Sequence, residues 1–139
     1  MRILAVDPGE VNLGIAISDP TGNIATPKTV IHHSSRTADA ERIAALAEEA
    51  GCGTIVIGLA LPADGGETET SRRARNLAAE IRRQSGLPVV LWDEAGSTQA
   101  ARAAAIAMGV PKKKRTGHLD ANAAAVILQS YLDNINNEN

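Results

Sequence analysis

The sequence has very few aromatic residues. Among its 139 residues, Trp92 and Tyr131 are the only aromatic rings of the Phe, Trp and Tyr types, and phenylalanine is absent. We therefore expect a core packed from Ala, Ile, Leu and Val. The scarcity also disfavours base-stacking platforms, which need exposed aromatic rings to bind single-stranded nucleic acid.

Cysteine, long apolar runs and excess charge are also scarce. Cys52 is the single cysteine, so it has no partner for an internal disulfide, and a reduced, cytoplasmic setting is expected. No apolar run approaches the roughly 18 residues of a membrane span, and no cationic leader precedes the first apolar segment. The net charge of −2 means that any nucleic-acid binding depends on local basic clusters.

The chain length and the order of its apolar segments predict one α/β domain over residues 1–139. Strands are expected over residues 3–7, 13–18 and 24–31, with a turn-rich link before the third that suits a hairpin. Pro27 would remove a ladder hydrogen bond, so it predicts an edge position or a bulge for that third strand.

Later segments alternate between helix and strand patterns. Helices are expected over residues 38–50, ended by Gly51, and over residues 70–84. Buried strands are expected over residues 54–58 and 88–92, with an alanine-rich helix after Ser97 and, beyond a turn at Gly117, a last helix over residues 118–133. This order predicts a mixed five-stranded sheet, three antiparallel strands and then parallel ones, with helices on both faces.

Three acidic residues stand at the ends of elements that should meet. Asp7 ends the first strand, Glu94 follows the last strand, and Asp120 lies in the first turn of the last helix, beside small alanines. Three carboxylates in one pocket repel one another unless a cation is bound. Oxygen ligands without His or Cys select Mg²⁺ or Mn²⁺, and two such ions about 3.5–4 Å apart are suited to phosphodiester cleavage.

Each acid also has a purely structural interpretation. Asp7 precedes Pro8-Gly9 and could be a turn residue. Asp93-Glu94 could be a solvated strand end, and Asp120 could be an acid favoured by the helix dipole. The metal-site hypothesis depends on all three falling at one junction.

These segments together resemble the YqgF/RuvX family of small RNase H-like nucleases, described as Holliday junction resolvases and as nucleases that mature the small-subunit ribosomal RNA precursor. The similarity covers nearly the whole chain. It implies an RNase H-like fold and an acidic site of Asp7, Glu94 and Asp120. The residues that carry it are Ala5-Val6-Asp7-Pro8-Gly9, Gly14-Ile15-Ala16-Ile17-Ser18-Asp19, Ile55-Val56-Ile57-Gly58-Leu59 with Asp64-Gly65, Asp93-Glu94 with Ser97-Thr98, and the segment from Leu119 to Leu132.

The chain departs from the family pattern at three places. The family usually has an arginine just before the isoleucine-glycine of the second strand, whereas Leu13 precedes Gly14 here. Ala95 follows Glu94 where the family has arginine, and Ala60 stands where it has proline. Two arginines suited to bidentate phosphate contact are therefore missing.

Other residues are candidates for contacting nucleic acid. Lys112, Lys113, Lys114 and Arg115 lie just upstream of Asp120 and could contact the phosphate backbone, although such a run can also be a solvated loop. Arg72, Arg73 and Arg75 form a weaker second candidate. Gly14 could let a nucleic-acid backbone approach the second strand, or it could mark a bulge.

Three functions are compatible with the sequence. The leading one is a metal-dependent nuclease acting on branched DNA or precursor rRNA, as a homodimer if it cuts a four-way junction symmetrically. The missing arginines motivate the alternative of a catalytically weak or inactive nucleic-acid-binding module. The third, a sugar kinase or actin-like ATPase with Asp7-Pro8-Gly9 as a phosphate loop, would need a second domain and an adenosine site, for which the chain has no room.

Overall fold

The computed structural model describes residues 1–59, 66–93 and 112–137, and for residues 112–120 it describes the backbone alone. In chain order the elements are β1 (Arg2–Pro8), β2 (Asn12–Ser18), β3 (Ala25–His32), α1 (Arg36–Ala50), β4 (Cys52–Leu59), α2 (Glu69–Ser85), β5 (Val89–Asp93) and α4 (Lys112–Asn137). Residues 60–65 and 94–111 fall outside the described residues, and with them the alanine-rich helix expected after Ser97.

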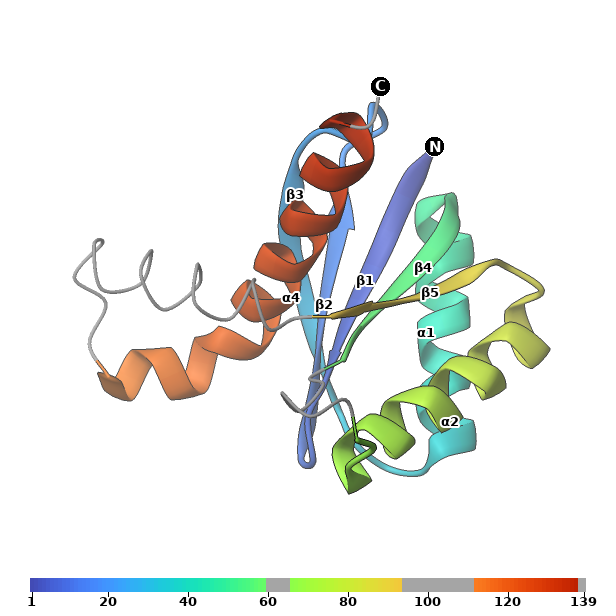
Figure 1. Cartoon of the computed structure of the whole chain (residues 1–139), viewed down its shortest axis with the longest axis vertical. Helices are drawn as coiled ribbons and strands as arrows, with labels where there is room; N and C mark the ends of the chain where they lie inside the picture. The colour runs from blue at the N-terminus through green and yellow to red at the C-terminus, as the bar shows by residue number, and fades with distance from the viewer. Residues whose placement is uncertain (60–65, 94–111, 138–139) are drawn as a thin grey trace.

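The strands form one mixed sheet in the order β3-β2-β1-β4-β5 (Figure 1). β1 pairs antiparallel with β2, and β2 pairs antiparallel with β3. β4 lies parallel to β1, and β5 lies parallel to β4. The predicted mixed five-stranded sheet is therefore confirmed.

β3 has both features that Pro27 predicted. It is an edge strand, and its register against β2 shifts between the pairs Ile15↔Thr29 and Ala16↔Pro27. Proline has no backbone N–H to donate to a ladder, so an irregular edge strand accommodates it.

The turn between β2 and β3 is organised by Asp19. Its carboxylate accepts hydrogen bonds from the hydroxyl of Thr21 and from the backbone N–H groups of Ile24 (2.9 Å) and Asn23 (2.8 Å). These hydrogen bonds stabilise the charged form and lower the pKa of Asp19 to about 2. Gly22 adopts φ 75° in the same turn, a conformation that glycine takes without steric cost.

Caps fix the ends of the first two helices. The Ser35 hydroxyl accepts from the Ala38 N–H at the start of α1, and Thr68 and Ser71 form a reciprocal capping box at the start of α2. Gly51 ends α1 in the left-handed conformation with φ 71°, as the sequence predicted.

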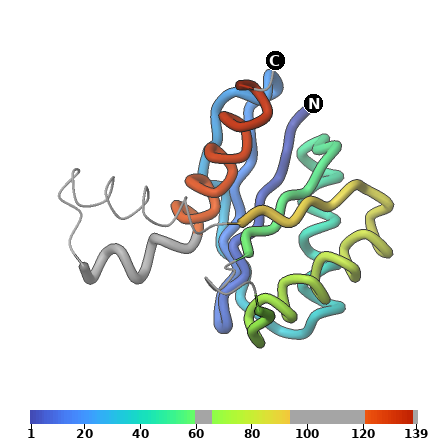
Figure 2. The backbone as a smooth tube through the Cα atoms, in the orientation of Figure 1, coloured from blue at the N-terminus to red at the C-terminus, as the bar shows by residue number. Residues whose placement is uncertain are grey.

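Helices cover both faces of the sheet, as predicted, and each face has its own core (Figures 1 and 2). α1 and α2 lie on one face, where Leu4, Val6, Ile15 and Ile57 are buried with the helices' apolar residues. α4 lies on the other face. Its core contains the buried residues Ala5, Ala16, Val56, Ala124, Ile127, Leu128 and Leu132.

The start of α4 differs from the prediction. A turn at Gly117 and a helix from residue 118 were expected, but α4 already begins at Lys112 and passes through Gly117. One glycine inside a helix costs only about 1 kcal/mol, and the flanking lysines, arginine, leucine and alanines are good helix formers. The basic run is thus helical and not a loop. None of the helices in the described part of the chain is long and apolar enough to span a membrane.

Gln129 ties α4 to the turn between β2 and β3. Its side-chain oxygen accepts from the Ala25 N–H at 2.9 Å, and its side-chain nitrogen donates to the Asn23 carbonyl at 2.9 Å. A second link lies two turns later, where Asn136 donates to the Gly22 carbonyl at 3.2 Å.

Replacing Gln129 with alanine should lower the free energy of unfolding by about 1–3 kcal/mol, because it leaves a partly buried N–H and a carbonyl without their partner. Urea denaturation monitored by circular dichroism measures this change. The control is Asn122→Ala, an exposed position on the same helix, which should change stability by less than about 0.5 kcal/mol. Equal effects of the two substitutions would contradict this role of Gln129.

Candidate active site

Asp7 lies at the carboxyl end of β1, on the face of the sheet that α4 covers. Successive strand residues point to opposite faces. Leu4 and Val6 are buried in the core under α1 and α2, whereas Ala5 is buried under α4. Asp7 therefore shares the α4 face with Ala5, and it is half-buried there.

Glycine positions flank Asp7 on both neighbouring strands. Asp7 pairs with Gly14 of β2. Val6 pairs with Ile57 of β4, and continuing that register by one residue places Gly58 beside Asp7. Strand alternation puts both glycines on the α4 face, because Leu13, Ile15, Ile57 and Leu59 all belong to the opposite core. The two neighbouring positions thus add no side chain to the space around Asp7.

Gly14 was predicted either to let a nucleic-acid backbone approach or to mark a bulge. The register shift of β2 lies one residue later, between Ile15 and Ala16, so Gly14 itself pairs regularly with Asp7 and with Val30. Gly14 is buried. Its contact with nucleic acid stays a prediction. A larger residue at this position would place a side chain beside Asp7.

The C-terminal ends of the parallel strands lie at the same edge of the sheet as Asp7. β4 separates β1 from β5, so the end of β5 lies two strand spacings, roughly 10 Å, from β1. Asp93 is the last residue of β5. Glu94 lies outside the described residues, and its convergence with Asp7 stays a prediction.

Asp120 belongs to α4, which packs against β1, β2 and β3. Helical spacing places position 120 one turn before Ala124, which is completely buried against the sheet. The side chains of Asp120 and of the basic run Lys112, Lys113, Lys114 and Arg115 lie outside the described part. Their roles therefore stay predictions.

The aromatic pair attaches α4 to β5 near this edge. The rings of Trp92 and Tyr131 meet edge to face with centroids 5.4 Å apart, a favourable geometry for aromatic rings. The Trp92 indole N–H also donates to the Ser130 hydroxyl at 3.3 Å. Trp92 packs against the α4 core. β5 is thus attached to α4, the helix that contains Asp120.

A metal site cannot be assembled from the described side chains alone. Within residues 1–59, 66–93 and 121–137, no group of three His, Cys, Asp or Glu side chains is placed to hold a metal ion. Two of the three predicted ligands lie outside these ranges. Asp7 is the one predicted ligand whose surroundings the structure describes.

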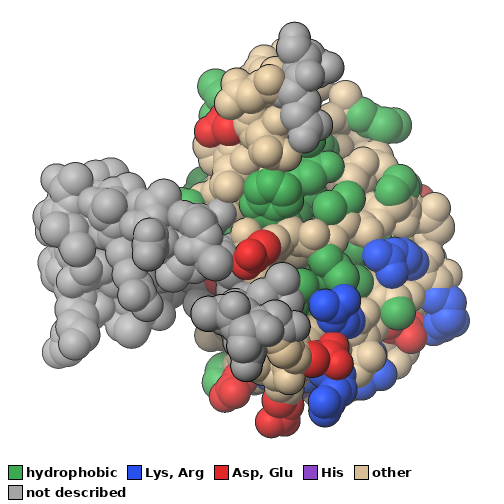
Figure 3. Space-filling model, viewed as in Figure 1, with side chains coloured by type: hydrophobic (Ala, Val, Ile, Leu, Met, Phe, Trp, Pro, Cys, Tyr) green, Lys and Arg blue, Asp and Glu red, His purple; other side chains and the backbone are tan. Residues whose placement is uncertain are grey.

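The arginines of α2 lie near acidic side chains, and Figure 3 shows Lys and Arg side chains on this side of the molecule with Asp and Glu side chains among them. Arg75 pairs with Glu67 at 3.1 Å, and Arg83 pairs with Glu80. Arg82 donates to the Val89 carbonyl at 2.8 Å, and Arg73 donates to the Gly9 carbonyl at 3.4 Å. Among the three predicted α2 candidates, Arg75 is therefore engaged with a carboxylate, and Arg73 reaches the turn that follows Asp7.

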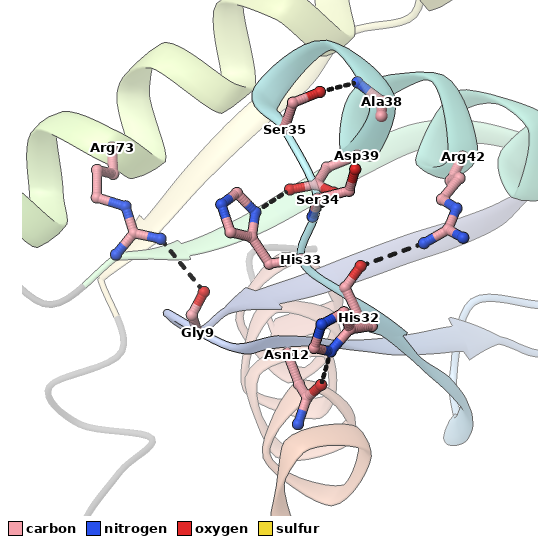
Figure 4. Close-up of polar contacts among 10 residues, drawn as sticks. All are labelled: Gly9, Asn12, His32, His33, Ser34, Ser35, Ala38, Asp39, Arg42 and Arg73. Atoms are coloured by element: carbon pink, nitrogen blue, oxygen red, sulfur yellow. Dashed lines mark hydrogen bonds and ion pairs between the residues drawn. The ribbon is translucent and has the colours of Figure 1, made fainter.

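A buried polar pair near that turn was not predicted from the sequence. Asp39 of α1 is 2% exposed, and its carboxylate accepts from His33 Nδ1 and from the Ser34 N–H at 3.1 Å (Figure 4). A carboxylate is seldom fully buried without such partners. The one available signal was Asp39 on the apolar side of its helix, in step with Ile43 and Ala47.

The chain is similar to a family of Holliday junction resolvases and to proteins named as pre-16S rRNA nucleases. A family model described as RuvX, Holliday junction resolvase, matches residues 1–134. A "putative pre-16S rRNA nuclease" of Anaeromyxobacter sp. (strain Fw109-5) is 42% identical over 133 residues, covering 96% of this chain and 97% of the relative. A protein of the same name from Geobacillus kaustophilus is 42% identical over 135 residues, covering 96% and 98%.

Solved structures show the same fold at low sequence identity. Thermus thermophilus RuvC in complex with a Holliday junction substrate superposes with a TM-score of 0.57 at 17% identity, covering 95% of this chain and 93% of that one. The fowlpox virus Holliday junction resolvase superposes with a TM-score of 0.56 at 19% identity, covering 96% and 99%. The likeness supports the predicted RNase H-like architecture.

Asp39→Asn should lower the free energy of unfolding by about 1–3 kcal/mol, because the neutral amide accepts more weakly than the carboxylate and places an N–H donor where the Asp39 oxygens accept from His33 and Ser34. Equilibrium urea denaturation at neutral pH measures the loss. Glu41→Gln, an exposed position on the same helix, is the matched control. A loss no larger than that of the control would show that the buried pair adds nothing to stability.

Proposed function

Since this chain belongs to the RuvX family of Holliday junction resolvases, whose model it matches over residues 1–134, we propose that it hydrolyses phosphodiester bonds in structured nucleic acid. The substrate is either a four-way DNA junction or the precursor of 16S rRNA. The observation that carries the proposal is Asp7, a half-buried carboxylate at the end of the central strand with glycine positions on both sides.

The proposed metal ligands are Asp7, Glu94 and Asp120, and the proposed cofactor is a pair of Mg²⁺ or Mn²⁺ ions. The donor chemistry fits such a cofactor, because the Asp7 carboxylate is a hard oxygen ligand and the neighbouring positions Gly14 and Gly58 add no side chains beside it. Bound divalent ions supply an activated water and stabilise the charge that develops on the leaving oxygen.

The chain's own residues hold these acids in place. The antiparallel pairing of β1 with β2 and its parallel pairing with β4 fix the position of Asp7. The apolar core beneath α4 fixes the distance between that helix and the sheet, and the Trp92–Tyr131 pair attaches α4 to β5. Asp7 is thus carried by a central strand of the sheet, which suits a site that must hold its geometry.

The substrate's phosphates are proposed to contact the basic run from Lys112 to Arg115. This run forms the first turn of α4, and Asp120 lies two turns further along the same helix. Lys and Arg side chains position a nucleic-acid backbone without reading its sequence. We further propose that residues 1–139 act as one nuclease domain in the bacterial cytoplasm, and that two copies act together when a four-way junction is cut symmetrically.

The missing arginines favour a second candidate function. Leu13 and Ala95 stand where the family's arginines are expected, so a module that binds nucleic acid with little or no turnover is the alternative. Salt-dependent binding without metal-dependent cleavage would identify it. The two functions are separated by the following test.

Asp7→Asn should reduce cleavage by more than about 100-fold, because it removes a charged metal ligand, and loss of groups that merely support such ligands already costs 10–100-fold. Branched DNA and 16S rRNA precursor should be tested separately, each with Mg²⁺ and with Mn²⁺. Asp133→Asn, an exposed acid on α4, is the control and should retain activity. Equal rates for wild type and Asp7→Asn would refute the nuclease proposal.

Gly58→Val should weaken Mn²⁺ binding by about tenfold, because it adds a branched side chain beside Asp7. Valine favours strands, so β4 should still form. Isothermal titration calorimetry measures the affinity, and circular dichroism checks that the fold is intact. Thr54→Val, near the other end of β4, is the matched control. Unchanged affinity in a folded Gly58→Val variant would argue against a metal in this space.

A further inference from the structure

A cavity opens at the edge of the sheet where Asp7 lies, on the face opposite α4. It lies where the turn after β1 meets the start of α1 and the start of α2, and its volume is about 240 Å³. That is smaller than most pockets for drug-sized ligands, which suits one small group. Its polar lining includes Gly9, His33, Ser35, Arg36, Thr70 and Arg73.

The imidazole of His33 is held in one orientation at this cavity. Its Nδ1 faces the buried carboxylate of Asp39, so Nδ1 carries the proton and Nε2 lies on the other side of the ring. In Figure 4 the ring lies between the Asp39 carboxylate and the Arg73 guanidinium. No described residue bonds to Nε2, and the side chain of His33 is 36% exposed. The ring therefore presents a fixed polar edge to the cavity.

Arg73 lies across the cavity from Asp39. It reaches over from α2, and one of its terminal nitrogens donates to the Gly9 carbonyl at 3.4 Å. This long bond orients the guanidinium, whose remaining donors match the geometry of phosphate oxygens. Arg73 is half-buried, so its charge is less hydrated than that of a surface arginine.

The charges around the cavity are positive overall. Arg36 and Arg73 contribute two positive charges and Asp39 one negative charge, which leaves +1 with a neutral His33. Arg36 also acts on Glu80, whose pKa is lowered chiefly by hydrogen bonds from Arg83 and Gln84. Asp39 also lines the cavity, but it is 2% exposed and its carboxylate accepts from the His33 ring and from the Ser34 N–H.

We propose that this cavity binds one phosphate group of the nucleic acid, held by Arg73, Arg36 and His33. Pro8 lines the cavity and directly follows Asp7 in β1. A phosphate held here thus lies just beyond the carboxyl end of β1, across the sheet from the face that Asp7 occupies. A strand bound at both places passes around the edge of the sheet. The identity of the ligand rests on the proposed function, whereas the affinity for phosphate does not.

The first experiment measures binding of a fluorescent four-way DNA junction and of a 16S precursor RNA fragment by anisotropy, in EDTA so that no cleavage occurs. Arg73→Gln should weaken binding by about tenfold and reduce the slope of log K against log salt by about 1. Arg83→Gln is the matched control, because Arg83 is an exposed arginine on the same helix and does not line the cavity. If Arg73→Gln folds poorly, Arg36→Gln at the exposed start of α1 tests the same site and should also weaken binding.

The second experiment titrates inorganic phosphate and follows the His33 ring signals by NMR. Saturable shifts that disappear in Arg73→Gln but persist in Arg83→Gln would support a phosphate site, whether or not wild-type protein cleaves nucleic acid. Saturable shifts combined with unchanged junction and RNA binding would overturn the nucleic-acid part and assign the site to a free phosphorylated ligand. Equal effects of Arg83→Gln and Arg73→Gln, or no saturable shift, would overturn the whole proposal.

Discussion

The close packing of α4 on the sheet is the contact on which the proposed site depends. Ala5, Ala16 and Ala124 are completely buried in this layer, and small side chains let a helix lie near the strands. The helix position is then fixed by larger neighbours, Ile127, Leu128 and Leu132, and by the hydrogen bonds of Gln129 to the hairpin. Asp120 lies one helical turn before Ala124 in α4, so its proposed convergence with Asp7 depends on this packing.

The layer formed by α1 and α2 covers the other face of the sheet. α1 and α2 bury the larger part of the core, with the isoleucines and leucines of β1, β2 and β4 beneath them. They also begin at the carboxyl edge of the parallel strands, which is the edge where polar groups collect in open α/β sheets. Chemistry-bearing residues are thus available on both faces of one edge. Asp7 lies on one face, and His33 with Arg73 lies on the other.

The sequence predicted most of this architecture because the local signals were strong. The hairpin link around Asp19, the cap at Gly51 and the proline in β3 each had a single physical interpretation. The start of α4 was wrong because Lys112 to Gly117 suits either a loop or a helix, and propensity alone does not decide between them. Gly58 beside Asp7 follows only from the strand order, since residues some fifty positions apart become neighbours by pairing. The His33–Asp39 contact was missed because it joins a strand end to a helix start.

The irregular edge at Pro27 also limits how two copies of this chain can associate. An exposed edge strand ordinarily offers a continuous row of donors and acceptors to a second molecule. Here one donor is absent and the ladder is offset by a bulge, so a partner strand would lose alignment halfway along. Continuous strand pairing between two copies through β3 is therefore disfavoured.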